Sequence, residues 1–181
     1  MSAATEPWPR AVVAMHWLTA TALFGLLGLG FLMTHAELEA GRKFDLYQLH
    51  KTYGWLTLWL VGLRIVVRVF SSSPPPIGGR LERVIARGVR MALYVLMVAL
   101  PLVGWLRVSS SPIPIPVDLF GFGAAPSIAA MNPEFSEAAA QAHAALAFIL
   151  ALAVALHVAA ALKHRFIDRD EVLDRMSPWT S

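Results

Sequence analysis

Hydrophobic residues are concentrated in four long blocks of this chain, separated by more polar segments. The blocks cover about residues 11–35, 48–70, 84–107 and 138–165. Each is long enough to cross the hydrocarbon core of a bilayer as a helix, which takes about 20 residues. The pattern predicts an all-α fold, an integral membrane four-helix bundle that forms a single membrane domain over residues 1–181. A breaker-rich turn, SSSPPPIGGR, joins the middle two spans. The longer outer loop, 108–137, is expected to be structured over the bundle surface.

Composition agrees with a protein that sits in a lipid bilayer. The chain has 181 residues, of which 57% are apolar and 15% are charged, whereas charged residues make up about 25% of a soluble domain. It contains no cysteine, which excludes disulfides, iron–sulfur clusters, thiolate zinc sites and covalently attached c-type haem. Its six histidines are therefore the main candidate ligands for a metal or cofactor. The charge pattern indicates no nucleic-acid partner.

Basic residues are unevenly divided between the two sides of the predicted bundle. Eleven lie on the side of the termini: Arg10, Arg64, Arg68, Arg80, Arg83, Arg87, Arg90, Lys163, Arg165, Arg169 and Arg175. The opposite side has four: Arg42, Lys43, Lys51 and Arg107. Because basic residues are enriched on the cytoplasmic side of membrane proteins, both the N- and C-termini are predicted to be cytoplasmic.

Two histidines in the last span carry the most information about function. His143 and His157 lie fourteen residues apart in an otherwise apolar stretch. On a helix this spacing covers about 21 Å and returns to within roughly 40° of the same face. Ionisable side chains at this depth are costly and usually face a partner inside the bundle. The two positions therefore predict functional sites near both membrane surfaces, or, alternatively, two hydrogen-bonded interior histidines.

Depth sorts four of the histidines into two pairs. His16 follows Arg10, and His157 precedes Lys163, by six residues each, which places both imidazoles about 9 Å inside the same membrane edge. His50 opens the second span and lies on the outer side with His143. The sequence thus predicts an inner pair, His16 with His157, and an outer pair, His50 with His143. His35 and His164 lie at the membrane edges, where solvated interface roles are expected, although His164 is an alternative inner ligand.

The residues near each pair favour haem over a bare metal ion. Zinc would require four ligands, and no carboxylate or thiolate accompanies either pair; copper usually recruits cysteine or methionine. A haem supplies four nitrogens and needs only two axial ligands, and its propionates are attracted to arginine at the membrane edge. Arg64 shares a helix face with His50 but lies at the depth of the inner pair. It is therefore either an inner-haem propionate partner or simply a basic residue of the cytoplasmic side.

Several local sequences together resemble those of the bacterial cytochrome b561 family, over most of the chain. They are His16-Trp17 opening the first span, His50 and Arg64 in the second, ALPLVGW in the third, and His143…His157 followed by AAALKHRF in the fourth. The resemblance implies a multi-pass protein of the bacterial inner membrane with two non-covalent haem b groups. It also implies that the axial ligands are His16 and His157 for the inner haem, and His50 and His143 for the outer haem.

The family resemblance also implies an activity, that of a superoxide:ubiquinone oxidoreductase. Such a protein oxidises superoxide on the periplasmic side and passes the electrons to ubiquinone. A positive outer surface would steer the superoxide anion, but six acidic residues face four basic ones there. We therefore expect only a local positive entrance, formed by Lys51 beside His50 together with Arg42, Lys43 and Arg107. The alternative for Lys51 is a solvated rim charge.

A second functional class is also consistent with these features. The chain would then be a cytochrome b subunit that relays electrons between a partner dehydrogenase or soluble cytochrome and the quinone pool. The arginine-rich inner side would be its docking surface. A haem-free channel or transporter is disfavoured, because the sequence has neither inverted repeats nor interrupted helices.

Overall fold

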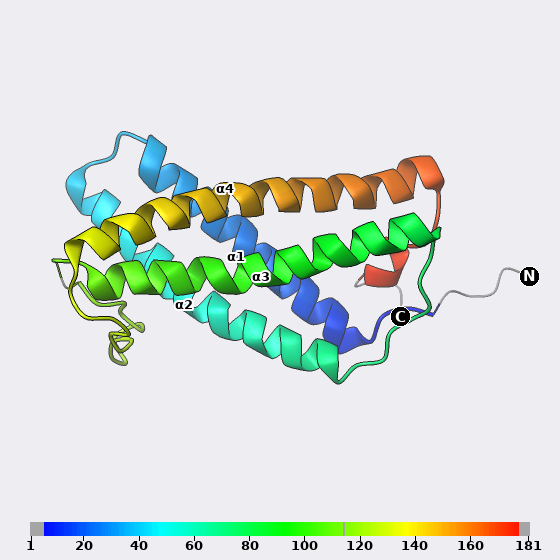
Figure 1. Cartoon of the computed structure of the whole chain (residues 1–181), viewed down its shortest axis with the longest axis horizontal. Helices are drawn as coiled ribbons and strands as arrows, with labels where there is room; N and C mark the ends of the chain where they lie inside the picture. The colour runs from blue at the N-terminus through cyan, green and yellow to red at the C-terminus, as the bar shows by residue number, and fades with distance from the viewer. Residues whose placement is uncertain (1–5, 114, 178–181) are drawn as a thin grey trace, which may run out of the picture.

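The computed structural model describes residues 6–113 and 115–177, and its elements are all helical. They are α1 (Arg10–His35), α2 (Ala40–Val69), α3 (Arg80–Ser110), α4 (Pro133–Lys163), the π-helix η1 (His164–Asp168) and the 3-10 helix η2 (Asp174–Met176). The four long helices run alternately up and down in one bundle (Figure 1). All four are long and apolar enough to cross a membrane. The predicted all-α, four-helix membrane architecture is confirmed.

The helices extend beyond the apolar blocks that predicted them. α2 begins at Ala40 rather than near residue 48, and α3 and α4 are also longer than predicted. Hydropathy marks only the part of a helix that lies in hydrocarbon, whereas the backbone can remain helical among headgroups and water. Local caps stabilise these polar ends. The Asn132 side chain accepts a hydrogen bond from the Phe135 N–H (3.0 Å) at the start of α4.

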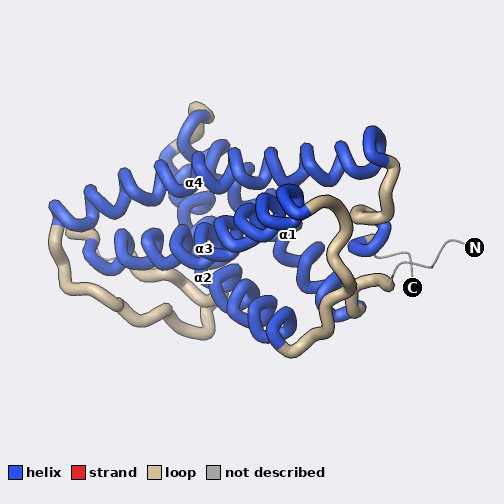
Figure 2. The backbone as a smooth tube through the Cα atoms, turned by 45° about the vertical axis from the view of Figure 1, so that its right-hand side comes forward, coloured by secondary structure: helices blue, strands red, loops and turns tan. Residues whose placement is uncertain are grey.

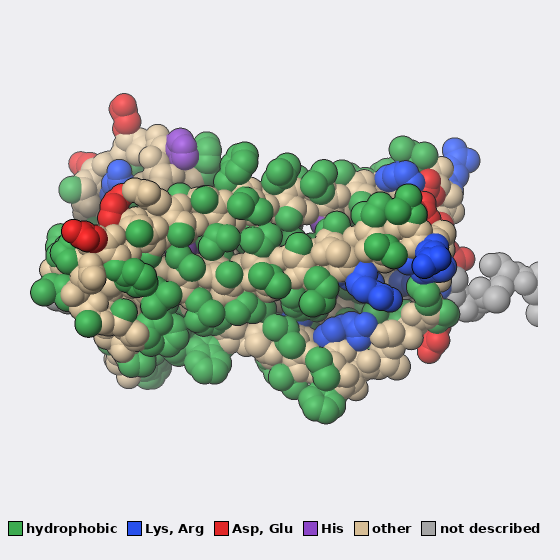
Figure 3. Space-filling model, in the orientation of Figure 1, with side chains coloured by type: hydrophobic (Ala, Val, Ile, Leu, Met, Phe, Trp, Pro, Cys, Tyr) green, Lys and Arg blue, Asp and Glu red, His purple; other side chains and the backbone are tan. Residues whose placement is uncertain are grey.

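The interior of the bundle is small, and its outer surface is apolar. A cluster of Val61, Met97 and Leu150 forms the buried core at mid-height, where α2, α3 and α4 meet. Large apolar side chains point outward; Phe148, for example, is 74% exposed. Hydrophobic side chains are spread along the whole length of the visible face in Figure 3, whereas charged side chains lie toward its two ends. Such a surface is suited to lipid, because in water an apolar patch of this extent would promote aggregation.

The described ends of the chain and the α2–α3 connection meet at one end of the bundle (Figure 2). The buried Arg175 links them: its Nη1 donates to the Pro75 carbonyl (2.6 Å), and its own carbonyl accepts from the Trp8 N–H (3.2 Å). The Trp17 indole donates to the Met176 carbonyl (2.7 Å). The basic residues that were counted together from the sequence therefore lie at one end. That this end is cytoplasmic stays a prediction.

The loop between α3 and α4 folds back against the bundle at the opposite end. Asp118 and Ala124 form an isolated antiparallel bridge, and the Asp118 carbonyl accepts a hydrogen bond from the Thr52 hydroxyl of α2 (2.6 Å). The Trp105 indole of α3 donates to the Pro126 carbonyl (3.0 Å). These bonds satisfy backbone groups that the packed loop would otherwise leave unpaired. The described residues of the loop are therefore attached to the bundle at several points.

Candidate functional site

The structure brings four of the predicted site histidines together as two pairs. His16 on α1 faces His157 on α4, with 6.2 Å between the ring centroids. His50 on α2 faces His143 on α4, also with 6.2 Å between the centroids. Depth along the helices therefore identified the correct neighbours. Both pairs use α4, which presents one imidazole toward each end of the bundle.

The separation of the rings is suitable for one metal ion between each pair. An imidazole nitrogen lies about 1 Å from its ring centroid, and metal bonds to histidine are about 2 Å long. Two histidines on opposite sides of one metal ion therefore have centroids roughly 6 Å apart. Both pairs match this spacing without movement of their helices.

Neither pair has the further protein ligands that a bare metal ion would need. Within residues 6–113 and 115–177, the only group of three or more metal-ligating side chains is His164, Asp168 and Asp170, after the end of α4. A zinc ion between either pair would lack two of its four usual ligands. A haem carries its own four nitrogen ligands, so two opposed imidazoles are sufficient.

The outer pair is preorganised for ligation by its surroundings. The Nδ1–H of His143 donates to the Leu100 carbonyl of α3 (3.1 Å), because a carbonyl can only accept. In the neutral ring this leaves the Nε2 lone pair free to bind a metal. His50 Nδ1 is buried and has no hydrogen-bond partner among the described residues. An unpaired buried nitrogen is costly, and ligation of the His50 ring would fix its tautomer.

Two glycines leave space for the outer histidine rings. A Cβ atom built on Gly104 of α3 would lie 3.0 Å from His143 Cε1, and one on Gly30 of α1 would lie 3.4 Å from His50 Cε1. Any side chain at Gly104 would push the His143 ring from its position. Gly104 belongs to the ALPLVGW segment that was noted in the sequence. The sequence did not show, however, that this glycine lies next to His143.

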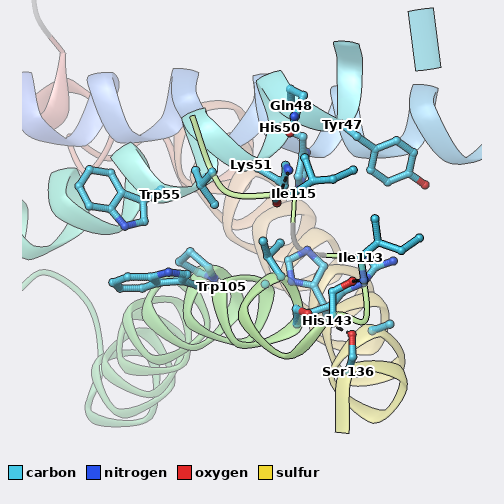
Figure 4. A pocket seen from close by; sticks show the side chains of 18 of the residues that line it. Tyr47, Gln48, His50, Lys51, Trp55, Trp105, Ile113, Ile115, Ser136 and His143 are labelled. Atoms are coloured by element: carbon cyan, nitrogen blue, oxygen red, sulfur yellow. Dashed lines mark hydrogen bonds between the residues drawn. The ribbon is translucent and has the colours of Figure 1, made fainter. Parts of the chain in front are cut away.

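The outer pair lines a cavity of about 400 Å³ between α2, α3, α4 and the α3–α4 loop. Trp55 and Trp105 lie along one side of it, and their rings contact each other edge to face (Figure 4). Lys51 and Arg107 also line it. The acidic Glu137 lines it as well, so the cavity combines aromatic walls with two positive charges and one negative charge. This net positive lining suits a flat apolar group that carries carboxylates. From the sequence, Arg107 was expected with Lys51 at a local positive entrance, and both line this cavity.

Lys51 lies at this cavity but is held by the loop. Its ammonium donates to the carbonyls of Ile115 (3.1 Å) and Pro116 (3.2 Å). The positive charge is thus fixed beside the outer pair rather than on a mobile chain. The same bonds anchor the loop, so Lys51 has a structural role that the sequence did not reveal.

Arg64 contacts the inner pair directly. Its Nη2 donates to His16 Nδ1 at 2.9 Å, and its guanidinium lies over the Tyr94 ring, 5.4 Å from the centroid. A guanidinium has no acceptor, so His16 Nδ1 accepts and the proton of the neutral ring is on Nε2. In this arrangement His16 does not offer Nε2 as a ligand. Arg64 is at the predicted depth, and its contact controls which His16 nitrogen is free.

The remaining two histidines lie outside the pairs. The His35 ring stacks on Phe31, with centroids 4.3 Å apart. His164 Nδ1 bonds to Asp170 (2.7 Å), and Asp168 lies 3.3 Å away. His157, and not His164, is the histidine that faces His16.

Comparison with known proteins gives two matches. Residues 7–179 match a family model described as prokaryotic cytochrome b561. The chain is also 33% identical to cytochrome b561 homolog 2 of Escherichia coli strain K12, over 165 residues that cover 90% of this chain and 87% of the relative.

Proposed function

Because this chain belongs to the prokaryotic cytochrome b561 family of membrane haem proteins, we propose that it binds two haem b groups and is a superoxide:ubiquinone oxidoreductase. The inner haem would be held by His16 and His157, and the outer haem by His50 and His143. Superoxide would be oxidised at the outer, periplasmic end, and the electrons would reduce ubiquinone. The family implies electron transfer and haem b; the haem number, the ligands and the substrates are our proposal.

The observation that carries this proposal is the equal spacing of the two histidine pairs. Each has ring centroids 6.2 Å apart, and the two α4 histidines are separated by about 21 Å along the helix. Two such sites at opposite depths favour electron transfer across the membrane over a purely structural role. The buried cluster of Val61, Met97 and Leu150 lies at mid-height, between the two sites.

Haem supplies the one-electron chemistry, while the protein controls position, charge and access. His143 is oriented by the Leu100 carbonyl, as described above. At the inner pair, a propionate carboxylate would attract the Arg64 guanidinium, which would free His16 Nδ1 to take the ring proton and Nε2 to bind iron. Arg64 would thus couple haem binding to the His16 tautomer.

The overall reaction balances with two superoxide anions for each ubiquinone. Each superoxide loses one electron and becomes O2. Ubiquinone takes up two electrons and two protons and becomes ubiquinol. The reaction needs no acid–base dyad at the superoxide end, so an anion-attracting cavity beside the outer pair is sufficient.

Loss of the Lys51 charge is expected to slow the reaction with superoxide. The variant Lys51→Gln should reduce the second-order rate constant about two- to fivefold at low salt, with a smaller difference at high salt, because electrostatic steering is screened. Stopped-flow measurement of haem reduction at two ionic strengths checks this. Thr52→Val is the matched control, since it removes another loop anchor from α2, Thr52 to Asp118, without changing charge. Equal slowing in both variants would assign the effect to the loop.

Replacing Arg64 with leucine is expected to lower the reduction potential of the inner haem more than that of the outer haem. The positive charge of Arg64 stabilises the reduced haem, so its loss lowers the reduction potential. The shift should be on the order of 50 mV, the effect of a partly screened unit charge. A spectroelectrochemical titration resolves the two haems. Arg68→Leu is the control, because Arg68 is engaged with Ser73 and the Trp8 ring instead. An equal shift of both haems would contradict the placement of Arg64 at the inner site.

A superoxide pulse tests the proposed activity. The purified protein is mixed with superoxide, and haem reduction is followed with and without ubiquinone. We expect reduction at near-collision rates and rapid reoxidation when ubiquinone is present. Slow reduction in a protein with full haem content would instead favour the cytochrome b subunit that relays electrons for a partner.

A further inference from the structure

Four arginines form one exposed stripe at the start of α3. Arg80, Arg83, Arg87 and Arg90 are all exposed, and their spacing of three, four and three residues places them within about 80° on one helix face. They lie at the end of the bundle where the described ends of the chain meet. Lys and Arg side chains gather at this end in Figure 3.

The stripe differs from Lys163 and Arg165, two other basic residues of this end, because within the described residues it has no acidic partner. Lys163 and Arg165 form ion pairs with Asp168 (2.5 Å) and Asp174 (3.2 Å), respectively. Among residues 6–113 and 115–177, none of the four stripe arginines forms an ion pair. Glu82 lies on the same turns, but its carboxylate accepts the Gly79 N–H (2.9 Å) and forms no ion pair with the stripe in the described structure. The described part of the chain therefore leaves the positive charge of the stripe available to a ligand.

The position of the stripe matches the headgroup layer of a membrane. α3 has 31 residues, about 46 Å of helix, whereas the hydrocarbon core is roughly 30 Å thick. The arginine-bearing turns precede the apolar part of α3 and extend past the hydrocarbon. Val84, Ile85 and Met91 on the same turns are 56–61% exposed. The segment thus presents guanidinium groups beside side chains suited to acyl chains.

We propose that this arginine stripe is a binding site for the phosphate headgroups of anionic phospholipids. Arg83 and Arg87 are one turn apart, so their Cβ atoms lie about 5–6 Å from each other. Guanidinium groups at this spacing can converge on one phosphate with forked hydrogen bonds. Arg83 also donates to the Gly78 carbonyl (2.8 Å), which holds its stem in place and leaves further N–H groups for a phosphate. An acidic soluble protein is disfavoured as the occupant, because the neighbouring exposed side chains are apolar.

The test measures lipid binding to the purified, haem-loaded protein in detergent by native mass spectrometry. The ligand is dioleoyl phosphatidylglycerol, and dioleoyl phosphatidylcholine and inorganic phosphate are measured as separate probes. The double variant Arg83→Gln/Arg87→Gln is compared with Arg42→Gln/Lys43→Gln, which removes two positive charges from the opposite end. We expect about thirtyfold weaker phosphatidylglycerol binding in the first variant, because each basic residue near an anionic surface contributes roughly fivefold. The second variant should bind as the unchanged protein does.

Each result decides the assignment. Tighter binding of phosphatidylglycerol than of phosphatidylcholine or inorganic phosphate, lost only in the Arg83/Arg87 variant, supports the lipid site. Equal binding of the two lipids, or equal loss in both variants, overturns it and identifies the stripe as a general positive surface. If inorganic phosphate bound as tightly as phosphatidylglycerol, the proposal that the bound phosphate belongs to a lipid headgroup would be overturned. A circular dichroism spectrum confirms that the glutamine variants keep their helices.

Discussion

The variant His157→Ala is expected to retain about one haem b per chain where the unchanged protein binds about two. The substitution removes one of the two imidazoles whose ring centroids lie 6.2 Å apart at the inner site, and the described residues around that pair offer no carboxylate or thiolate as a replacement ligand. The outer pair, at the other end of α4, keeps both of its imidazoles. Pyridine haemochrome spectra, divided by the protein concentration from amino-acid analysis, give the haem number directly.

A set of matched variants shows which histidines share a haem. His16→Ala should lose the same haem as His157→Ala, so the double variant should lose no more than either single one. Combining His157→Ala with His143→Ala should remove both haems. Resolved α-band spectra identify the haem that remains. The assignment of pairs would be wrong if His16→Ala and His157→Ala retained haems with different spectra and if their double variant retained none.

Replacing Gly104 with valine is expected to displace the outer haem while leaving the inner one in place. Even a Cβ at this position would lie 3.0 Å from His143 Cε1 and 3.1 Å from Nδ1. The ring would have to move, which would break its hydrogen bond to the Leu100 carbonyl. Overpacking of this kind costs roughly 1–3 kcal/mol, which corresponds to about 5- to 150-fold weaker haem binding. Haem content after washing with apomyoglobin as a haem acceptor measures the loss.

Gly88→Val on the same helix is the matched control for this substitution. A Cβ at Gly88 meets nothing within 4 Å, and glycine and valine differ little in helix propensity compared with the expected clash. The control should retain both haems through the same wash. If Gly104→Val also retained both, with an unchanged potential for the outer haem, the close approach of α3 to His143 would have no bearing on haem binding.

The sequence predicted the parts of this fold that depend on hydropathy and helix geometry. Apolar blocks of membrane length gave the four helices, and the fixed rise and rotation of a helix gave the depth and face of His143 and His157. The helix ends were less well predicted, because α2 starts within a polar segment at Ala40. Hydropathy does not predict where a helix ends once it extends from the membrane into water.

The remaining features depend on contacts between helices, and these contacts cannot be predicted from a single sequence. The Leu100 carbonyl that orients His143 and the absent side chain of Gly104 come from α3, far along the chain from their partner. The bond from Arg64 to His16 adds a tautomer constraint that depth alone could not reveal. Lys51 was predicted to lie at a positive substrate entrance or to be a solvated rim charge, whereas its contacts with Ile115 and Pro116 depend on how the loop folds. Each of these features depends on a residue that is close in space but distant in the sequence.

The number of haems in the purified protein tests most directly whether both histidine pairs hold iron porphyrin. The measurement is a pyridine haemochrome titration of the full-length protein, produced in cells supplied with excess haem precursor. The account predicts about two b-type haems per chain, with low-spin spectra typical of two imidazole ligands. A colourless protein, or one with a single haem that survives both His143→Ala and His157→Ala, would contradict it.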